Sequence, residues 1–119
     1  MIIMIDDNKD LNSITCKLLS ILGYDVVSAL SGQEGIDKAR EKKPKVILSD
    51  IGMPGIDGYD LAKIIRQDAY LKDIYLIAIS GYSSQSDIDR SIEAGFDKHI
   101  GKPIDIQVLK KILDEVFSS

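Results

Sequence analysis

The sequence of 119 residues is poor in cysteine, and its single cysteine, Cys16, excludes two kinds of protein. An intramolecular disulfide needs two cysteines, and a cysteine-rich metal site needs several. Cys16 lies among Ile14, Leu18 and Leu19, so we interpret it as a small hydrophobic residue of the core.

The sequence also lacks long apolar runs and an excess of positive charge. Its apolar runs reach only about five residues, against roughly 20 for a membrane-spanning helix, and no charged leader precedes an apolar segment. Nineteen acidic residues outnumber fifteen basic ones, for a formal net charge of −4. Binding to nucleic-acid phosphates relies on a basic excess. We therefore expect a soluble cytoplasmic protein with no membrane insertion and no direct binding of nucleic acid.

What is present is an ordinary globular composition, with 45% hydrophobic and 29% charged residues. The length is typical of one domain, and no linker rich in Ser, Gly or Pro interrupts the chain. We therefore expect a single domain over residues 1–119, without an effector domain.

Short apolar runs alternate with segments of helical spacing. The runs are continuous and rich in β-branched residues, which is typical of strands covered on both faces in a parallel sheet. The expected strands are Ile2–Ile5, Asp25–Ala29, Val46–Leu48, Leu76–Ile79 and, with less apolar character, Asp97–Ile100. Strands that alternate with helices predict an α/β fold with right-handed crossovers and helices on both faces of the sheet.

Each helix is expected from its apolar spacing and its end signals. Ser31 with Glu34, and Ser84 with Asp87, form capping-box patterns, and Asp105 is a candidate N-cap. The apolar stripes are Leu11, Ile14, Leu18 and Leu22 before Gly23; Ile36 and Ala39 before Pro44; Leu61, Ile64 and Ile65; Ile88 and Ile92 before Gly95; and Leu109, Ile112, Leu113 and Val116. One helix is therefore expected after each strand.

Polar residues follow four of the five expected strands. Asp6 and Asp7 follow the first, and Asp50 comes just past the third. Ser80 follows the fourth, and Lys102 comes after the fifth. Parallel strands end at one edge of the sheet, where open α/β sheets bind their ligands. We therefore expect three carboxylates, one hydroxyl and one ammonium to converge at this edge.

This set of groups predicts a phosphoryl site. Clustered carboxylates repel one another and need a cation, and oxygen ligands without His or Cys favour Mg²⁺. Lys102 and Ser80 would bind oxygens of a transferring phosphoryl group. Asp50 stands alone at its strand end, so it is the candidate nucleophile that would form an aspartyl phosphate. Taken singly, each residue also fits a structural role at a strand end, in a turn or on the surface.

Four segments together resemble the receiver domain of two-component response regulators and hybrid histidine kinases, the CheY-like domain. They are Ile5–Asn8 (IDDN), Asp50–Tyr59 (DIGMPGIDGY), Ser80–Gly81 and Lys102–Pro103, in that order. The resemblance extends over essentially the whole chain. It implies a flavodoxin-like, doubly wound α/β fold, in which five parallel strands have the order 2-1-3-4-5 and five helices cover the two faces.

The resemblance also implies a function, that of a non-enzymatic phosphoacceptor domain in a two-component phosphorelay. Asp50 would receive a phosphoryl group from a histidine kinase or a histidine phosphotransfer protein, and the domain would then act on a downstream effector. Asp7, Asp50 and the main-chain carbonyl of Gly52 would bind Mg²⁺, for which Mn²⁺ can substitute. Asp6 would act at the metal mainly through water.

Other residues of the resemblance concern switching and lifetime. Lys102 and Ser80 would contact the phosphoryl oxygens, and Ser80, which stands where threonine is more frequent, would move to switch the face of the fourth helix, fifth strand and fifth helix. His99 stands where an aromatic residue often acts as the rotameric switch, so it is either a switch residue or an exposed polar residue of an edge strand. Gly52, with no side chain to orient water, and Tyr82, as a shield of the acyl phosphate, predict slow dephosphorylation.

Two other functions stay open. An Mg²⁺-dependent phosphatase can also use an aspartyl nucleophile, but such hydrolases usually have a second Asp two residues after it, where this chain has Gly52. The other alternative is a degenerate receiver that only binds partners. The presence of Asp6, Asp7, Asp50, Ser80 and Lys102 argues against it.

Overall fold

The computed structural model describes residues 1–118, in which five strands alternate with five α-helices. The strands are β1 (Ile2–Ile5), β2 (Val26–Ala29), β3 (Val46–Asp50), β4 (Tyr75–Ser80) and β5 (Lys98–Gly101). The helices are α1 (Lys9–Ile21), α2 (Gly32–Lys42), α3 (Gly58–Gln67), α4 (Gln85–Ala94) and α5 (Ile106–Phe117). All strand pairs are parallel and the order is β2-β1-β3-β4-β5, so the predicted α/β fold is confirmed.

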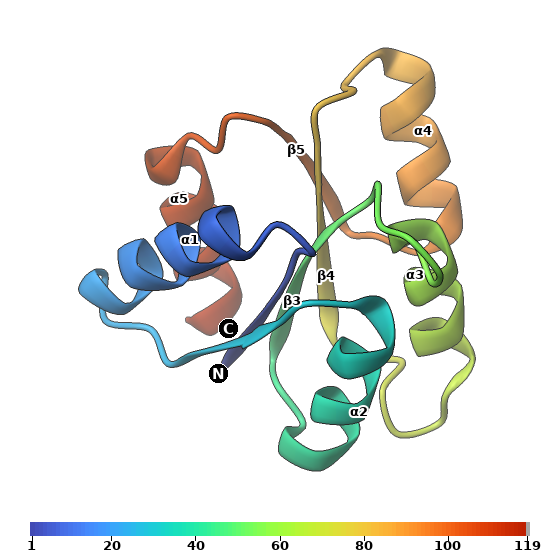
Figure 1. Cartoon of the computed structure of the whole chain (residues 1–119), viewed down its shortest axis with the longest axis horizontal. Coiled ribbons are helices and arrows are strands. Elements are labelled where there is room, and N and C mark those ends of the chain that lie inside the picture. The colour runs from blue at the N-terminus through green and yellow to red at the C-terminus, as the bar shows by residue number, and fades with distance from the viewer. Residues whose placement is uncertain (119) are drawn as a thin grey trace.

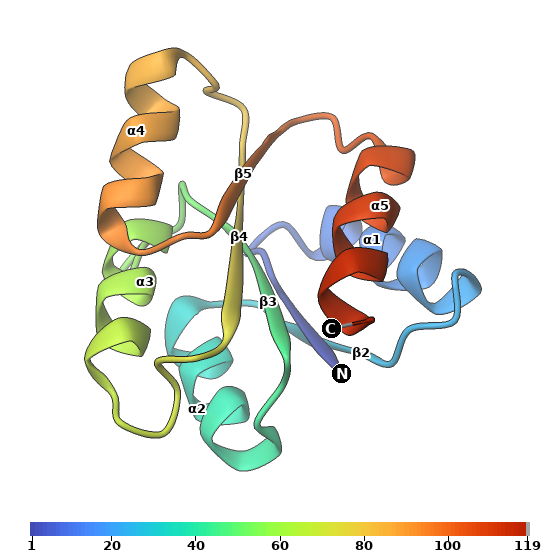
Figure 2. The same ribbon diagram turned by 180° about the vertical axis from the view of Figure 1, so that it is seen from behind.

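The helices form a layer on each face of the sheet. Helices α1 and α5 lie on one face, and α2, α3 and α4 lie on the other (Figures 1 and 2). Strand β1 alternates its side chains between two cores, with Ile3 and Ile5 in the core under α2 and α3 and with Ile2 and Met4 in the core under α1 and α5. Both faces are thus buried, which explains the continuous apolar strands. Among residues 1–118, no helix has the length and apolar character needed to cross a membrane.

The predicted helix caps are present, with one change of partner. Ser84 and Asp87 form a complete capping box at the start of α4. At the start of α2, the Ser31 hydroxyl accepts from the N–H of Glu34 at 3.1 Å. The Glu34 carboxylate accepts from the N–H of Leu30 at 3.3 Å, one residue before the N-cap. Side-chain oxygens therefore accept from main-chain N–H groups at both helix starts.

The apolar stripe that predicted the first helix does not face the core. Leu11, Ile14 and Leu18 are 44%, 54% and 41% exposed. The side chains that α1 buries are those of Asn12, Thr15 and Leu19. The rotation of α1 follows from Asn12, because its amide donates to carbonyl oxygens at the ends of β1 and β2. An apolar row is thereby left on the surface of α1.

Cys16 lies at the margin of the core, whereas the sequence predicted that it would lie within the core. It is half-buried and free. Its thiol donates to Oδ1 of Asn12 at 3.3 Å, and burial raises the pKa of the thiol. The thiol has this polar partner because Asn12 points inward one helical turn earlier.

Candidate functional site

The five residues predicted to converge all lie at the carboxyl edge of the sheet. Asp50 is the last residue of β3 and Ser80 the last of β4, so both strands run further than the apolar runs indicated. Asp6 and Asp7 follow β1, and Lys102 follows β5. Since β1 and β5 flank the β3–β4 pair, these residues share one edge of the sheet. The side chains that come together there are those of Asp6, Asp7, Asp50 and Lys102.

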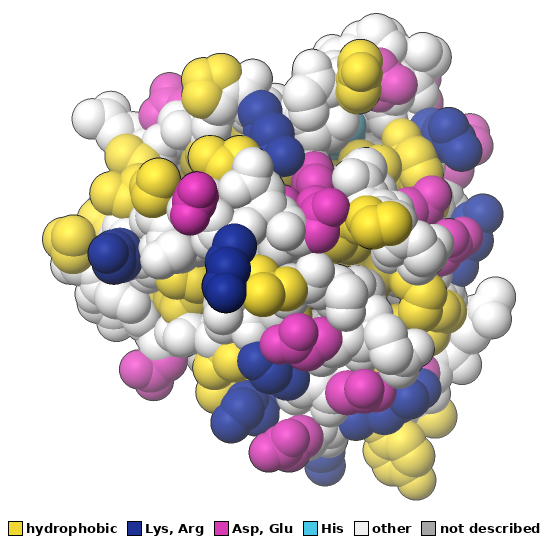
Figure 3. All heavy atoms as spheres, in the orientation of Figure 1, with side chains coloured by type: hydrophobic (Ala, Val, Ile, Leu, Met, Phe, Trp, Pro, Cys, Tyr) yellow, Lys and Arg dark blue, Asp and Glu magenta, His cyan; other side chains and the backbone are white. Residues whose placement is uncertain are grey.

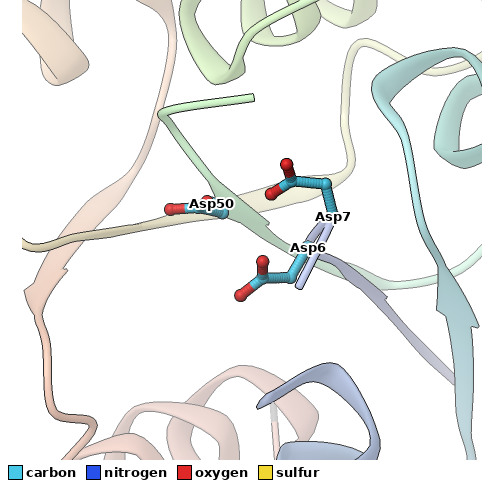
Figure 4. Close-up of side chains that lie close together, drawn as sticks. All are labelled: Asp6, Asp7 and Asp50. Atoms are coloured by element: carbon cyan, nitrogen blue, oxygen red, sulfur yellow. The ribbon is translucent and has the colours of Figure 1, made fainter. Parts of the chain in front are cut away.

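The three carboxylates form a cluster with one lysine. One oxygen from each of Asp6, Asp7 and Asp50 lies within 4.8 Å of the others. Figure 4 shows the three side chains pointing the same way from adjacent strand ends. Nζ of Lys102 lies 3.1 Å from Oδ1 of Asp50 and 3.8 Å from Oδ2 of Asp6. Asp6 and Asp50 are buried, whereas Asp7 is exposed.

The cluster carries more negative than positive charge. Burial raises the pKa of Asp6, and the nearby charges of Asp50 and Asp7 raise it further. The N–H of Asn8, which donates to Oδ1 of Asp6 at 2.9 Å, and the charge of Lys102 act in the opposite direction. One ammonium among three carboxylates leaves two negative charges in excess. An all-oxygen donor set with this excess fits a hard divalent cation, so the cluster could hold a metal ion.

The chain after Asp50 is held by the start of α3. The N–H of Gly58 donates to the carbonyl oxygen of Ile51 at 2.9 Å. A Cβ at Gly58 would lie 2.7 Å from Cα of Ile51 and 2.8 Å from the carbonyl oxygen of Asp50. Glycine is therefore needed for this close approach. At Gly52 a Cβ would have no neighbour within 4 Å, so the main chain faces open space there.

Ser80 and Lys102 are joined through the main chain. The N–H of Lys102 donates to the carbonyl oxygen of Ser80 at 2.8 Å. The buried Ser80 hydroxyl accepts from the N–H of Tyr82 at 3.0 Å. Because Oγ is the acceptor in this bond, its proton can still be donated to an oxygen at the site. The Tyr82 side chain is 79% exposed.

His99 connects the loop after β4 to α4. Its Nδ1 lies 2.9 Å from Oγ of Ser91, and its Nε2 lies 3.3 Å from Oγ of Ser83. The Ser91 hydroxyl donates to the carbonyl oxygen of Ile88 at 2.7 Å, so it accepts from His99. This assigns the proton of a neutral imidazole to Nδ1 and leaves Nε2 to accept from Ser83. His99 is half-buried and bonded through both ring nitrogens, rather than simply exposed.

An apolar groove lies beside the cluster. It has a volume of about 430 Å³ and lies between α1 and the segment after Lys102. Its lining includes Leu11, Ile14 and Leu18, the apolar row of α1, together with Ile104. Figure 3 shows hydrophobic side chains gathered on the side where Figure 1 places α1 and α5. Asp6 and Lys102 form the polar end of the same groove.

Asn12, which was not predicted as a site residue, is 1% exposed and bonded to the carbonyl oxygen of Asp6. The available signal was a polar residue one helical turn after the N-cap Asn8, within a helix of otherwise apolar spacing. That spacing instead predicted that Leu11 and Ile14 would lie on the buried face of the helix. The burial of this amide depends on its hydrogen-bond partners, which lie in β1 and β2 and are distant from Asn12 in the sequence.

Fold and site together define a doubly wound α/β protein with an acidic cluster and a lysine at the carboxyl edge of its sheet. The family model of the response regulator receiver domain matches residues 2–114. The chain belongs to this family, whose members act in two-component signalling. The resemblance inferred from the sequence motifs is thereby confirmed.

Similar proteins agree with this assignment. The polar-differentiation response regulator DivK of Brucella ovis is 30% identical over 105 residues, which span 88% of this chain and 85% of DivK. The solved structure of the chemotaxis protein CheY4 of Vibrio cholerae has a TM-score of 0.89 at 25% identity, over 97% of this chain and 96% of that one. The signal receiver domain of a signal transduction histidine kinase from Syntrophus aciditrophicus has a TM-score of 0.89 at 28% identity, over 98% and 89%.

Proposed function

We propose that this chain is the phosphoacceptor of a two-component phosphorelay and that Asp50 receives the phosphoryl group with Mg²⁺ bound at the acidic cluster. The observation that carries the proposal is the geometry at Asp50. Its carboxylate lies 3.1 Å from Nζ of Lys102 and within 4.8 Å of oxygens of Asp6 and Asp7. We take residues 1–119 as a single receiver domain that assists its own phosphorylation rather than turning over a separate substrate.

The transfer is a displacement at phosphorus. A carboxylate oxygen of Asp50 forms the new bond to phosphorus while the bond to the histidine nitrogen of the donor breaks. The electron pair of the broken bond stays on the nitrogen of the leaving imidazole. This imidazole is neutral when its other ring nitrogen carries a proton. Lys102 pairs with an incoming phosphoryl oxygen, and the Ser80 hydroxyl donates to another. When bound, Mg²⁺ neutralises charge on the carboxylates and the phosphoryl group. We assign its ligation to Asp7, Asp50 and the Gly52 carbonyl, with Asp6 acting through water.

The groove between α1 and Ile104 supports docking of the donor protein. A histidine kinase or phosphotransfer protein must bring its phosphohistidine to Asp50, so it must cover a surface next to the cluster. The groove meets this need, because its apolar end is formed by Leu11, Ile14 and Leu18 and its polar end by Asp6 and Lys102. An amphipathic helix that bears the phosphohistidine fits such a groove.

The contacts of His99 support a switch on the face formed by α4, β5 and α5. The acyl phosphate adds acceptor oxygens that draw the Ser80 hydroxyl inward. The loop from Ser80 to Ser83 then shifts, and with it the bond between Ser83 and His99. His99 passes this change to α4 through Ser91. We propose that a downstream effector binds this face.

Incubation with phosphoramidate and Mg²⁺, followed by the intact mass, tests the proposal. The wild-type chain should gain one phosphoryl group, and Asp50→Asn should gain none. Removal of Mg²⁺ with a chelator should abolish the gain. Continuous release of phosphate by the wild-type chain without a stable adduct would favour the phosphatase. An unchanged mass without phosphate release would favour the degenerate module.

A further inference from the structure

A buried amide on α1 holds the main chain next to the acidic cluster. Nδ2 of Asn12 lies 2.9 Å from the carbonyl oxygen of Ala29, 3.1 Å from that of Asp6 and 3.3 Å from that of Met4. Its Oδ1 accepts from the thiol of Cys16 at 3.3 Å. A flipped amide would place an acceptor against three carbonyl oxygens, so these contacts define its orientation.

The contact with Asp6 acts on both of the aspartates that follow β1. The carbonyl oxygen of Asp6 belongs to the peptide bond between Asp6 and Asp7, which is planar. A hydrogen bond that fixes this oxygen therefore also fixes the orientation of the peptide plane that leads into Asp7. The Asp6 carboxylate is held separately by the N–H of Asn8, and the N–H of Asn12 donates to the carbonyl oxygen of Asn8 at 2.9 Å. The turn of the two aspartates is thus fixed between β1 and the start of α1.

We infer that Asn12 is a positioning residue of the metal site, which keeps the carboxylates of Asp6 and Asp7 beside that of Asp50. Like charges at this separation repel one another, and a turn free to move would separate them. The amide prevents this from a site that is 1% exposed, where water does not compete for its hydrogen bonds. The inference rests on the proposed function, because it requires the cluster to bind Mg²⁺.

A purely structural role is the alternative, in which Asn12 stabilises the junction of β1, β2 and α1 and nothing more. The two roles differ in what a substitution changes. Loss of a positioning residue weakens metal binding in a chain that is fully folded, as loss of a group that orients metal ligands does in other proteins. Loss of a structural residue lowers the stability of the fold but leaves the metal affinity of the folded molecules unchanged.

The test measures the dissociation constant of Mg²⁺ by isothermal titration calorimetry, at a temperature at which circular dichroism shows each variant folded. Asn12→Leu keeps the approximate size of the side chain and removes its donors. Leu71→Ala is the matched control, because the side chain of Leu71 is as buried as that of Asn12. Leu71 lies in the core under α2 and α3, just before β4, at the edge of the sheet opposite the acidic cluster. We expect Asn12→Leu to bind Mg²⁺ about tenfold more weakly. Leu71→Ala should bind like the wild-type chain.

Several results would overturn the inference. One such result is an equal Mg²⁺ affinity of Asn12→Leu and the wild-type chain. Another is an equal loss of Mg²⁺ affinity in Asn12→Leu and Leu71→Ala. Either result would leave the proposed function intact. Absence of binding to the wild-type chain, or binding that Asp50→Asn leaves unchanged, would overturn the proposed metal site itself. If Asn12→Leu does not fold, Asn12→Ser replaces it, because the smaller side chain leaves room for water at the three carbonyl oxygens. The expected weakening has the same direction.

Discussion

Two residues near Asp50 bear on the lifetime of the proposed acyl phosphate. Gly52 has open space where a side chain would stand, and its backbone is outside the left-handed region. A larger residue is therefore accommodated there without displacing a neighbour. Tyr82 follows Ser80 by two positions and is 79% exposed, so its role as a shield stays a prediction.

Gly52→Asn should shorten the lifetime of phosphorylated Asp50. An amide at this position can orient a water molecule toward phosphorus, which we expect to raise the rate of hydrolysis on the order of tenfold. Tyr82→Ala should act in the same direction. The measurement is the decay of the phosphorylated mass after removal of the phosphodonor. Tyr70→Ala, an exposed tyrosine that follows α3, is the control and should have no effect. Rates equal to that of the wild-type chain in both test variants would refute the prediction.

Arg66 joins α3 to the segments around it through four hydrogen bonds. Its guanidinium donates to the carbonyl oxygens of Gly95, Lys72 and Ile74 at 2.8, 2.6 and 2.7 Å. It also donates to Oδ2 of Asp97 at 2.8 Å. These contacts connect α3 with the segment before β4 and with the turn between α4 and β5.

Arg66→Met should lower the free energy of unfolding by roughly 2–3 kcal/mol, because several hydrogen bonds to a charged group are lost and main-chain oxygens lose their donor. Urea unfolding provides the measurement. Lys63→Met, an exposed cation on the same helix, is the control and should change the free energy by less than about 0.5 kcal/mol. A similar loss in both variants would show that charge, rather than these bonds, is responsible.

At the scale of the element, the start of α4 combines a helix cap with a perturbed carboxyl group. The Ser84 hydroxyl donates to Oδ2 of Asp87 at 2.6 Å, and it lies 3.2 Å from the N–H of Asp87. The hydrogen bond from Ser84 holds the pKa of Asp87 below its ordinary value of 3.8. A carboxyl group with a lowered pKa in the folded state contributes stability above the unfolded pKa, and this contribution is lost as the pH falls through the folded pKa.

Ser84→Ala should therefore raise the pKa of Asp87 toward 3.8, as measured by an NMR titration of its carboxyl carbon. The difference in stability between the wild-type chain and Ser84→Ala should shrink as the pH falls below 3.8, where Asp87 becomes protonated in both. Ser13→Ala, an exposed serine on α1, is the control. An unchanged titration of Asp87 in Ser84→Ala would contradict the assigned cause.

Elements differ in how far the sequence predicted them. The helix starts at Ser84 and Asp105 were predicted because a cap involves only neighbouring residues. The buried face of a helix depends on what lies beneath it. On α4 the expected Ile92 is 47% exposed, while Ser91 and Ala94 are buried. Small residues face inward there, which lets α4 approach the sheet closely enough for Ser91 to reach His99.

At the scale of the whole molecule, the proposed metal should couple binding to folding. Asp50 lies more than forty residues after Asp6 and Asp7, so the cluster exists only when the sheet is formed. A ligand that binds only the folded state stabilises it by mass action.

Mg²⁺ at a hundred times its dissociation constant should stabilise the fold by about 2.7 kcal/mol. Thermal unfolding with and without MgCl₂, at matched ionic strength, measures this as a rise in the midpoint temperature. Asp50→Asn should show a much smaller rise, and a chelator should reverse the rise of the wild-type chain. Equal rises in the two proteins would show that the ion acts elsewhere.

The alternation of strands and helices and the polar residues at the strand ends were predicted from the sequence alone. Both are local properties, because apolar periodicity marks each element and Asp50, Ser80 and Lys102 stand where a strand stops. The 3.1 Å approach of Lys102 to Asp50 and the inward rotation of Asn12 toward three carbonyl oxygens depend on how the whole chain folds. These features could not be predicted because the rotation of a helix about its axis is set by the partners of its buried polar groups and by the packing of its neighbours. Those partners lie on strands far away in the chain.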